Sequence, residues 1–186
     1  MKKLSQYFYR KSSLGLALIV TAILFAYFAY VFMPAATCFA VDGSKTALGL
    51  SFGLPYELVQ DFFAVRTASM VRCYAEFNTI WDNIFPLIYG MTYVVWMSLI
   101  FKPVSTKLKL LNLLPLAQII FDWSENICLV DIANSVLAGE QISTSTVQVA
   151  SIFSVAKWSV SGLIFIAISI GVLLRIIWAI KGKKFD

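Results

Sequence analysis

Three carboxyl groups and one lysine stand inside apolar stretches of the chain, where ionisable side chains are costly. Asp82 lies near the start of one stretch, Asp122 and Glu125 lie within the next, and Lys157 lies within the last. Buried carboxyl groups can act as acids and bases, and a lysine beside them can stabilise negative charge. Because ionisable residues inside a bilayer usually face the interior of a bundle, we expect these four to meet.

Helical spacing gathers further polar and aromatic residues beside these four. Side chains three or four residues apart share one face of a helix. This rule predicts a polar chamber between three helices, with more aromatic lining from Trp81 and Trp123. Its predicted ligand-binding residues are Asp82, Tyr89, Tyr93, Gln118, Asp122, Glu125, Asn126, Lys157 and Trp158.

The charges of this chamber do not balance, because three acids face one lysine. One resolution is a carboxyl group that stays protonated at neutral pH. A second is that Arg72 reaches the chamber from outside as an accessory residue, and a third is that a cationic or amine-bearing ligand supplies the missing charge. A further alternative is an ion-pair network that only fixes helix packing.

The residue types absent from the chain exclude several kinds of site. The chain has no histidine, which excludes a His-ligated haem, a His-based zinc site and a Ser-His-Asp triad. The three cysteines form no Cys-x-x-Cys motif, so a zinc knuckle or a thioredoxin-like site has no support. We therefore predict neither a metal site nor a cofactor.

The composition indicates the class of protein that must hold these residues. Of 186 residues, 60% are hydrophobic and only 13% are charged, whereas soluble domains are about a quarter charged. This excludes a soluble enzyme and a nucleic-acid-binding module. We predict an all-α fold, a polytopic membrane four-helix bundle forming one membrane domain over residues 1–186. A bilayer needs about 20 apolar residues of helix, and spans are expected at about 14–33, 80–101, 110–136 and 147–180, the first stopped by Pro34.

The segment 35–79 is too long for a simple loop and predicts an extracytoplasmic cap. A helix start at Leu54-Pro55-Tyr56-Glu57 is followed by apolar residues at helical spacing, which indicates an amphipathic helix between the first two spans. The alternative is a hairpin that faces solvent. Cys38 and Cys73 both fall in this segment, so a disulfide is possible if the compartment is oxidising.

Small residues and basic residues predict packing and orientation. The stripe Gly15, Ala22, Ala26 and Ala29 suits close packing of the first span. Basic residues collect on the cytoplasmic side of membrane proteins, which predicts that both termini are cytoplasmic. Eleven of the fifteen basic residues fall on that side: Lys2, Lys3, Arg10, Lys11, Lys102, Lys107, Lys109, Arg175, Lys181, Lys183 and Lys184.

The charged motifs carry a resemblance to known proteins. The runs Asp82-Asn-Ile-Phe-Pro86-Leu-Ile-Tyr89, Asp122-Trp-Ser-Glu125-Asn126 and Lys157-Trp158 resemble those of small bacterial four-span integral membrane proteins of uncharacterised function. The resemblance covers most of the chain after Pro55 and implies the plasma (bacterial inner) membrane, but no activity. More loosely, the bundle is similar to EXPERA-type four-helix bundles, which implies a pocket for a lipid-like ligand.

Three functions remain open at this point. The first is binding, with transport as a variant, of a small amphiphilic or lipid-like ligand. The second is an intramembrane enzyme, an isomerase or lipid-modifying enzyme with Asp122, Glu125 and Lys157 as catalytic candidates. The third is a non-catalytic subunit or assembly factor. The expected partners are membrane lipids, the ligand, and a second copy or another membrane protein, with no nucleic acid.

Overall fold

The computed structural model describes residues 1–44, 47–102 and 110–181, and within these ranges the chain forms helices and loops without a strand. The α-helices are α1 (Lys2–Lys11), α2 (Leu14–Tyr27), α3 (Met33–Ala36), α4 (Tyr56–Ala64), α5 (Ala68–Thr79), α6 (Trp81–Ile100), α7 (Leu114–Leu137) and α8 (Thr144–Ile180). Shorter turns are the π-helical η1 (Phe28–Phe32) and the 3-10 helices η2 (Thr37–Phe39), η3 (Leu48–Leu50) and η5 (Leu111–Leu113).

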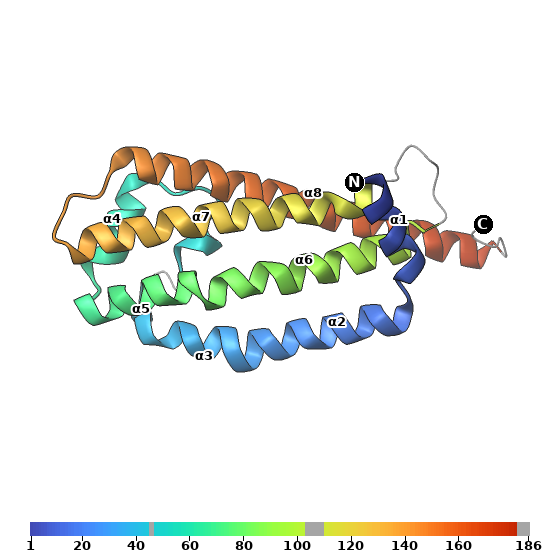
Figure 1. Cartoon of the computed structure of the whole chain (residues 1–186), viewed down its shortest axis with the longest axis horizontal. Coiled ribbons are helices and arrows are strands. Elements are labelled where there is room, and N and C mark those ends of the chain that lie inside the picture. Colours follow the sequence, from blue (N-terminus) through green and yellow to red (C-terminus); the bar gives the residue numbers. More distant parts are fainter. Residues whose placement is uncertain (45–46, 103–109, 182–186) are drawn as a thin grey trace.

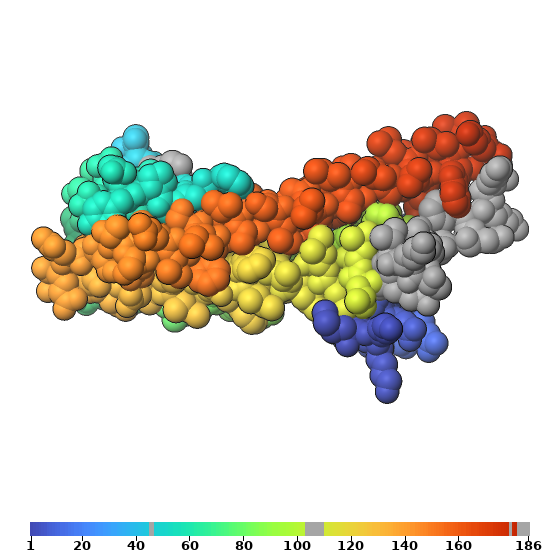
Figure 2. All heavy atoms as spheres, turned by 90° about the horizontal axis from the view of Figure 1, so that it is seen from above, coloured from blue at the N-terminus to red at the C-terminus, as the bar shows by residue number. Residues whose placement is uncertain are grey.

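Four helical stretches are long and apolar enough to cross a membrane, and they run side by side (Figure 1). They cover Leu14–Phe39, Ala68–Ile100, Leu111–Leu137 and Thr144–Trp178. The predicted all-helical bundle with four candidate spans is therefore confirmed. The last helix, α8, has 37 residues, which corresponds to about 55 Å at about 1.5 Å per residue. Its final turns extend past the other helices (Figure 2).

The packing of these helices is uneven. Helices α6, α7 and α8 contact one another, and α5 packs along α7. The first long helix lies mainly against α6, and most of its large side chains on the other faces are exposed. The first long helix therefore forms one flank of the bundle by itself, with α6 as its main neighbour.

The predicted stop at Pro34 is wrong, because the first helix continues through α3 and η2 to Phe39. Proline lacks an amide hydrogen and disrupts the interior of a regular α-helix. Here Pro34 stands in the first turn of α3, directly after the wide turn η1, where its missing N–H costs little. The widened turn thus lets the helix pass the proline.

The predicted small-residue contact face of the first helix is also wrong. Gly15, Ala22, Ala26 and Ala29 are exposed, whereas Ala17 is buried. Hydrogen bonds to α6 fix this rotation: Trp96 Nε1 donates to Thr21 Oγ1 at 2.8 Å, and Thr92 Oγ1 donates to the Val20 carbonyl at 3.3 Å. The polar contacts outweigh the small-residue pattern in choosing the face.

The predicted single helix of the cap is two helices. Residues 65–67 interrupt the helix between α4 and α5. Thr67 is the N-cap of α5, because its Oγ1 accepts from the Met70 amide at 3.4 Å. Helix α5 then leads into α6, so the second candidate span begins at Ala68, earlier than the predicted residue 80. Because α5 packs against α7, its apolar face enters the bundle core.

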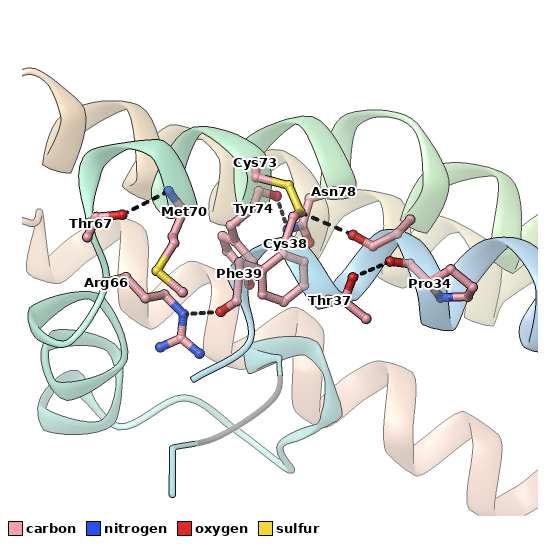
Figure 3. Close-up of a disulfide and its surroundings, with 11 residues drawn as sticks. Pro34, Thr37, Cys38, Phe39, Arg66, Thr67, Met70, Cys73, Tyr74 and Asn78 are labelled. Atoms are coloured by element: carbon pink, nitrogen blue, oxygen red, sulfur yellow. Dashed lines mark hydrogen bonds between the residues drawn. A yellow bond between two sulfur atoms is a disulfide. The ribbon is translucent and has the colours of Figure 1, made fainter. Parts of the chain in front are cut away.

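A disulfide and an aromatic core close this end of the bundle. Cys38 and Cys73 are bonded, with Cα atoms 6.3 Å apart, which joins η2 to α5 (Figure 3). The buried Phe39, Tyr74 and Phe77 rings contact one another beside the bridge, with centroids 5.0–5.1 Å apart. Arg66 Nε donates to the Phe39 carbonyl at 2.9 Å, which ties the end of α4 to η2.

The opposite end of the bundle is joined by buried polar side chains. Asn112 accepts from Ser5 Oγ at 2.7 Å and donates to Ser98 Oγ at 2.8 Å, which links α1, α6 and η5. Arg175 of α8 donates to the Leu99 and Ile100 carbonyls at 2.6 and 2.9 Å, at the end of α6. Of the basic residues used to predict orientation, Lys107, Lys109, Lys183 and Lys184 lie outside the described residues.

The approach of α6 to α7 depends on Gly90. A Cβ there would lie 2.4 Å from Ile119 Cδ1, whereas a Cβ on Gly162 would meet nothing within 4 Å. We expect Gly90→Ala to be less stable than Gly162→Ala by about 1–3 kcal/mol, because overpacking opposes the helix-propensity gain common to both. Denaturation of both variants in one detergent measures this. Equal stabilities would contradict the close contact.

The disulfide predicts a defined pattern of thiol reactivity. In denaturant without a reductant, only Cys128 should react with a maleimide polymer, because the other cysteines are bonded. After reduction all three cysteines should react, and each added polymer shifts the band on a gel. The Cys128→Ser variant is the control and should be unlabelled before reduction. Labelling of all three cysteines without a reductant would contradict the bridge.

Candidate functional site

Lys157 is the centre of the site. Its ammonium lies 3.3 Å from Asp122 Oδ1 and pairs with Glu125 Oε2. It also donates to the Gly49 carbonyl at 2.9 Å. An ammonium has three N–H donors, so these three oxygens use all of them.

Local structure explains why these groups meet. Asp122 and Glu125 are three residues apart on α7 and therefore share a face. That face packs against α8, which supplies Lys157. Glu125 is fully buried and the Lys157 side chain is 8% exposed, so each charge depends on the other to offset the loss of water.

Uncharged side chains extend the network on both sides. The Tyr89 hydroxyl of α6 donates to Asp122 Oδ2, so both oxygens of that carboxylate are engaged. On α8, Ser161 Oγ donates to the Lys157 carbonyl at 2.9 Å and accepts from Gln118 Nε2 at 2.7 Å. Three helices are thereby joined through side chains.

Asp82 approaches the lysine without an ion pair. It lies in the first turn of α6, and a Cβ on Gly49 would stand 3.9 Å from Asp82 Oδ2 and 3.6 Å from Lys157 Nζ. Asp82 is in no salt bridge within the described part of the chain, where Lys157 pairs with Asp122 and Glu125. The third carboxyl group is thus near the cluster but outside its ion pairs.

The segment around η3 contributes a part of the site that the sequence analysis missed. The Gly49 carbonyl accepts from Trp158 Nε1 at 3.3 Å as well as from Lys157. Beyond it, the Ser51 carbonyl accepts from Ser154 Oγ at 2.7 Å. The apolar run from Gly49 to Leu54, with glycines at both 49 and 53, is the signal that could have indicated a segment lying against a helix.

A cavity of about 190 Å³ adjoins this network. Part of its lining is charged and comes from Asp82, Asp122 and Lys157. Much of the rest is apolar and includes four phenylalanines. The lining residues are Phe28, Phe32, Met33, Ala36, Ala47, Gly49, Leu50, Phe77, Asp82, Phe85, Tyr89, Gln118, Asp122, Lys157, Trp158 and Ser161.

The rim of the cavity reaches the outer surface of the bundle. Phe28, Met33 and Leu50 line it and are 40%, 45% and 63% exposed. Phe28 belongs to η1 and Met33 to α3, whereas Leu50 belongs to η3. The cavity therefore has a side opening between the first long helix and η3.

The structure divides the predicted ligand-binding residues into three groups. Asp82, Tyr89, Gln118, Asp122, Lys157 and Trp158 line the cavity. Glu125 and Asn126 are buried behind it, where Asn126 Nδ2 donates to the Asp82 carbonyl at 3.0 Å. Tyr93 is away from the cavity, because Phe165 of α8 packs on its ring at a centroid distance of 5.6 Å.

Three other predicted contributors are also outside the cavity. Trp81 and Trp123 are partly exposed on the surface, and Trp123 Nε1 donates to the Asn83 carbonyl at 2.9 Å. Arg72 is exposed on α5 and forms no salt bridge in the described ranges. Within residues 1–44, 47–102 and 110–181, no three His, Cys, Asp or Glu side chains are grouped to hold a metal ion.

The site can thus hold a small molecule in a cavity with charged and aromatic lining residues, and the comparisons add no relative to this description. No protein-family model, curated protein or solved structure matches the chain. The resemblance found in the motifs therefore stays a prediction, and the function has to be argued from the geometry alone.

Proposed function

We propose that the chain is an integral membrane protein of a bacterial inner membrane, with both termini in the cytoplasm. The four long apolar helices support insertion. The basic α1 lies at the same end as the start of α7, because Ser5 binds Asn112. The disulfide between Cys38 and Cys73 lies at the other end, which suits an oxidising extracytoplasmic compartment.

We propose that this protein binds a small amphiphilic or lipid-like molecule, and that transport is a variant of the same function. The observation that carries the proposal is a cavity lined both by the charged Asp82, Asp122 and Lys157 and by the rings of Phe28, Phe32 and Phe85. Such a surface matches a molecule with a polar head and an apolar body. The side opening lies on helices that would face lipid, so an amphiphile would enter from the bilayer.

The size of the cavity limits what it encloses. Pockets for drug-sized ligands are about 300–1,000 Å³, and this cavity is about 190 Å³. It therefore suits a polar head and the first part of an apolar chain. The remainder of the chain would pass between Met33 and Leu50 into the lipid.

The buried ion pairs support a binding role over packing alone. Apolar residues of similar volume often stabilise a core as well as a buried ion pair does. An ion-pair network that served only helix packing would not require charged side chains in the lining of a cavity. Here Asp82 and Asp122 line open space, so their charges are available to a ligand as well as to the fold.

Filling the cavity should remove the binding. A photoactivatable fatty alcohol should label Phe28, Phe32 and Met33 in the wild-type protein, and Gly49→Leu should abolish this labelling, because its side chain would fill the space beside Lys157. Mass spectrometry of digested protein measures the labelled positions. Gly15→Leu is the matched control, since Gly15 has no neighbour within 4 Å. Undiminished labelling of all three residues in Gly49→Leu would reject the cavity as the binding site.

The charges of the network should be interdependent. Lys157→Met should lower the free energy of unfolding by about 3–5 kcal/mol, because two buried carboxylates lose their cation. Adding Asp122→Asn and Glu125→Gln to that variant should restore most of the loss. Denaturation in detergent measures both, with the exposed Lys181 changed to Met as the control. A Lys157→Met protein as stable as the wild type would show that the pairs are not needed.

A further inference from the structure

Three donor side chains that line the cavity already donate to the protein. Lys157 gives its three N–H groups to Asp122, Glu125 and the Gly49 carbonyl. The Tyr89 hydroxyl donates to Asp122, and Trp158 Nε1 donates to the Gly49 carbonyl. A ligand in the cavity therefore finds no spare donor on these three side chains.

An acceptor is left over at Gln118. The Ser161 hydroxyl donates to the Lys157 carbonyl, so Ser161 Oγ must accept from the amide nitrogen of Gln118. This assigns the end of the Gln118 side-chain amide that contacts Ser161 as the nitrogen. The other end of the amide is therefore Oε1. That oxygen is buried without a hydrogen-bond partner, in a residue that is 6% exposed and lines the cavity. Buried polar atoms are usually paired, so an unpaired one in a residue that lines a cavity is an acceptor that a small side-chain movement would offer to a ligand.

The Asp82 side chain favours the same kind of ligand as the unpaired acceptor of Gln118. The Asp82 carboxylate lines the same cavity and has no salt bridge in the described ranges. Phe28, Phe32 and Phe85 also line this cavity. Aromatic faces attract cations through their negative quadrupole, whereas they offer nothing to an anion.

We propose that the ligand is an amphiphile with a protonated amine as its head, bound by the Asp82 carboxylate and Gln118 Oε1. This inference rests on the proposed function, since it names the class of ligand that the same cavity takes. The amine supplies the N–H donors and the positive charge that the wall lacks. An anionic head would meet two carboxylates, and an alcohol would bring one donor and no charge.

Four probes with the same dodecyl chain differ only in the head group, so differences in their affinity report the contribution of the head group. Dodecylammonium, dodecyltrimethylammonium, dodecanol and dodecanoate are titrated into the full chain in phosphatidylcholine nanodiscs at neutral pH, and calorimetry is corrected with empty nanodiscs. Dodecylammonium should bind at least about tenfold more tightly than each of the others, because a hydrogen bond to a charged group is worth this much. The trimethylammonium probe keeps the charge but has no N–H donor.

Two variants locate the effect. Asp82→Asn keeps the shape of the side chain and should reduce dodecylammonium affinity to about that of dodecanol, a loss of about tenfold or more. Asp131→Asn removes the same charge from an exposed position of α7 and should bind like the wild type. A loss in both variants would show general attraction to acidic protein and would overturn the assignment to Asp82.

The probe series also separates the two proposals. If dodecanol or dodecanoate binds as tightly as dodecylammonium and Gly49→Leu blocks it, the cavity binds amphiphiles but the amine head is wrong. If dodecyltrimethylammonium equals dodecylammonium, the role given to Gln118 Oε1 is wrong. If no probe binds above the empty nanodiscs, the proposed function itself fails.

Discussion

The ion pairs of Lys157 with Asp122 and Glu125 are the constraint on which the rest of the structure depends. Charges buried in a medium of low dielectric are stable only in close and well-oriented pairs. The pairs fix which faces of α7 and α8 meet. Because the third donor goes to the Gly49 carbonyl, the same lysine also positions η3 against the bundle. One side chain thus sets the relation of two helices and the cap segment.

The cavity follows from how that lysine is used and from the uneven packing around it. Lys157 directs its N–H donors at protein oxygens, so it offers none to the neighbouring cavity. Hydrogen-bond acceptors therefore remain in the cavity lining. The first long helix lies mainly along α6, and its wide turn η1 contributes Phe28 and Phe32 to the cavity lining. A π-helical turn inside an α-helix often marks a functional position. Here it supplies the aromatic side of the cavity and accommodates Pro34.

The proximity of Asp82, Asp122, Glu125 and Lys157 could be predicted. Burying a charge costs free energy unless an opposite charge is near, so few arrangements of the helices are possible. The helical repeat then gave the face of α7 correctly, including Gln118. Tyr93 does not line the cavity, because spacing gives the face of a helix but not the depth, and one turn beyond Tyr89 the Phe165 ring packs against it. Gly49 was missed because it binds through its backbone carbonyl, which has no side-chain signature. The exposed small-residue stripe of α2 shows that a few polar contacts can decide a packing face.

The closed cap end determines how a ligand would reach the cavity. Phe39, Tyr74 and Phe77 form a buried core there, and the disulfide holds η2 on α5 above it. The chain between η2 and α4 is held again where the Leu54 amide donates to Ser151 Oγ at 2.8 Å. Entry from that end would require opening this core and breaking these contacts. The rim residues Phe28, Met33 and Leu50 are exposed, so under the proposed function the bilayer is both the source of the ligand and the route by which it arrives.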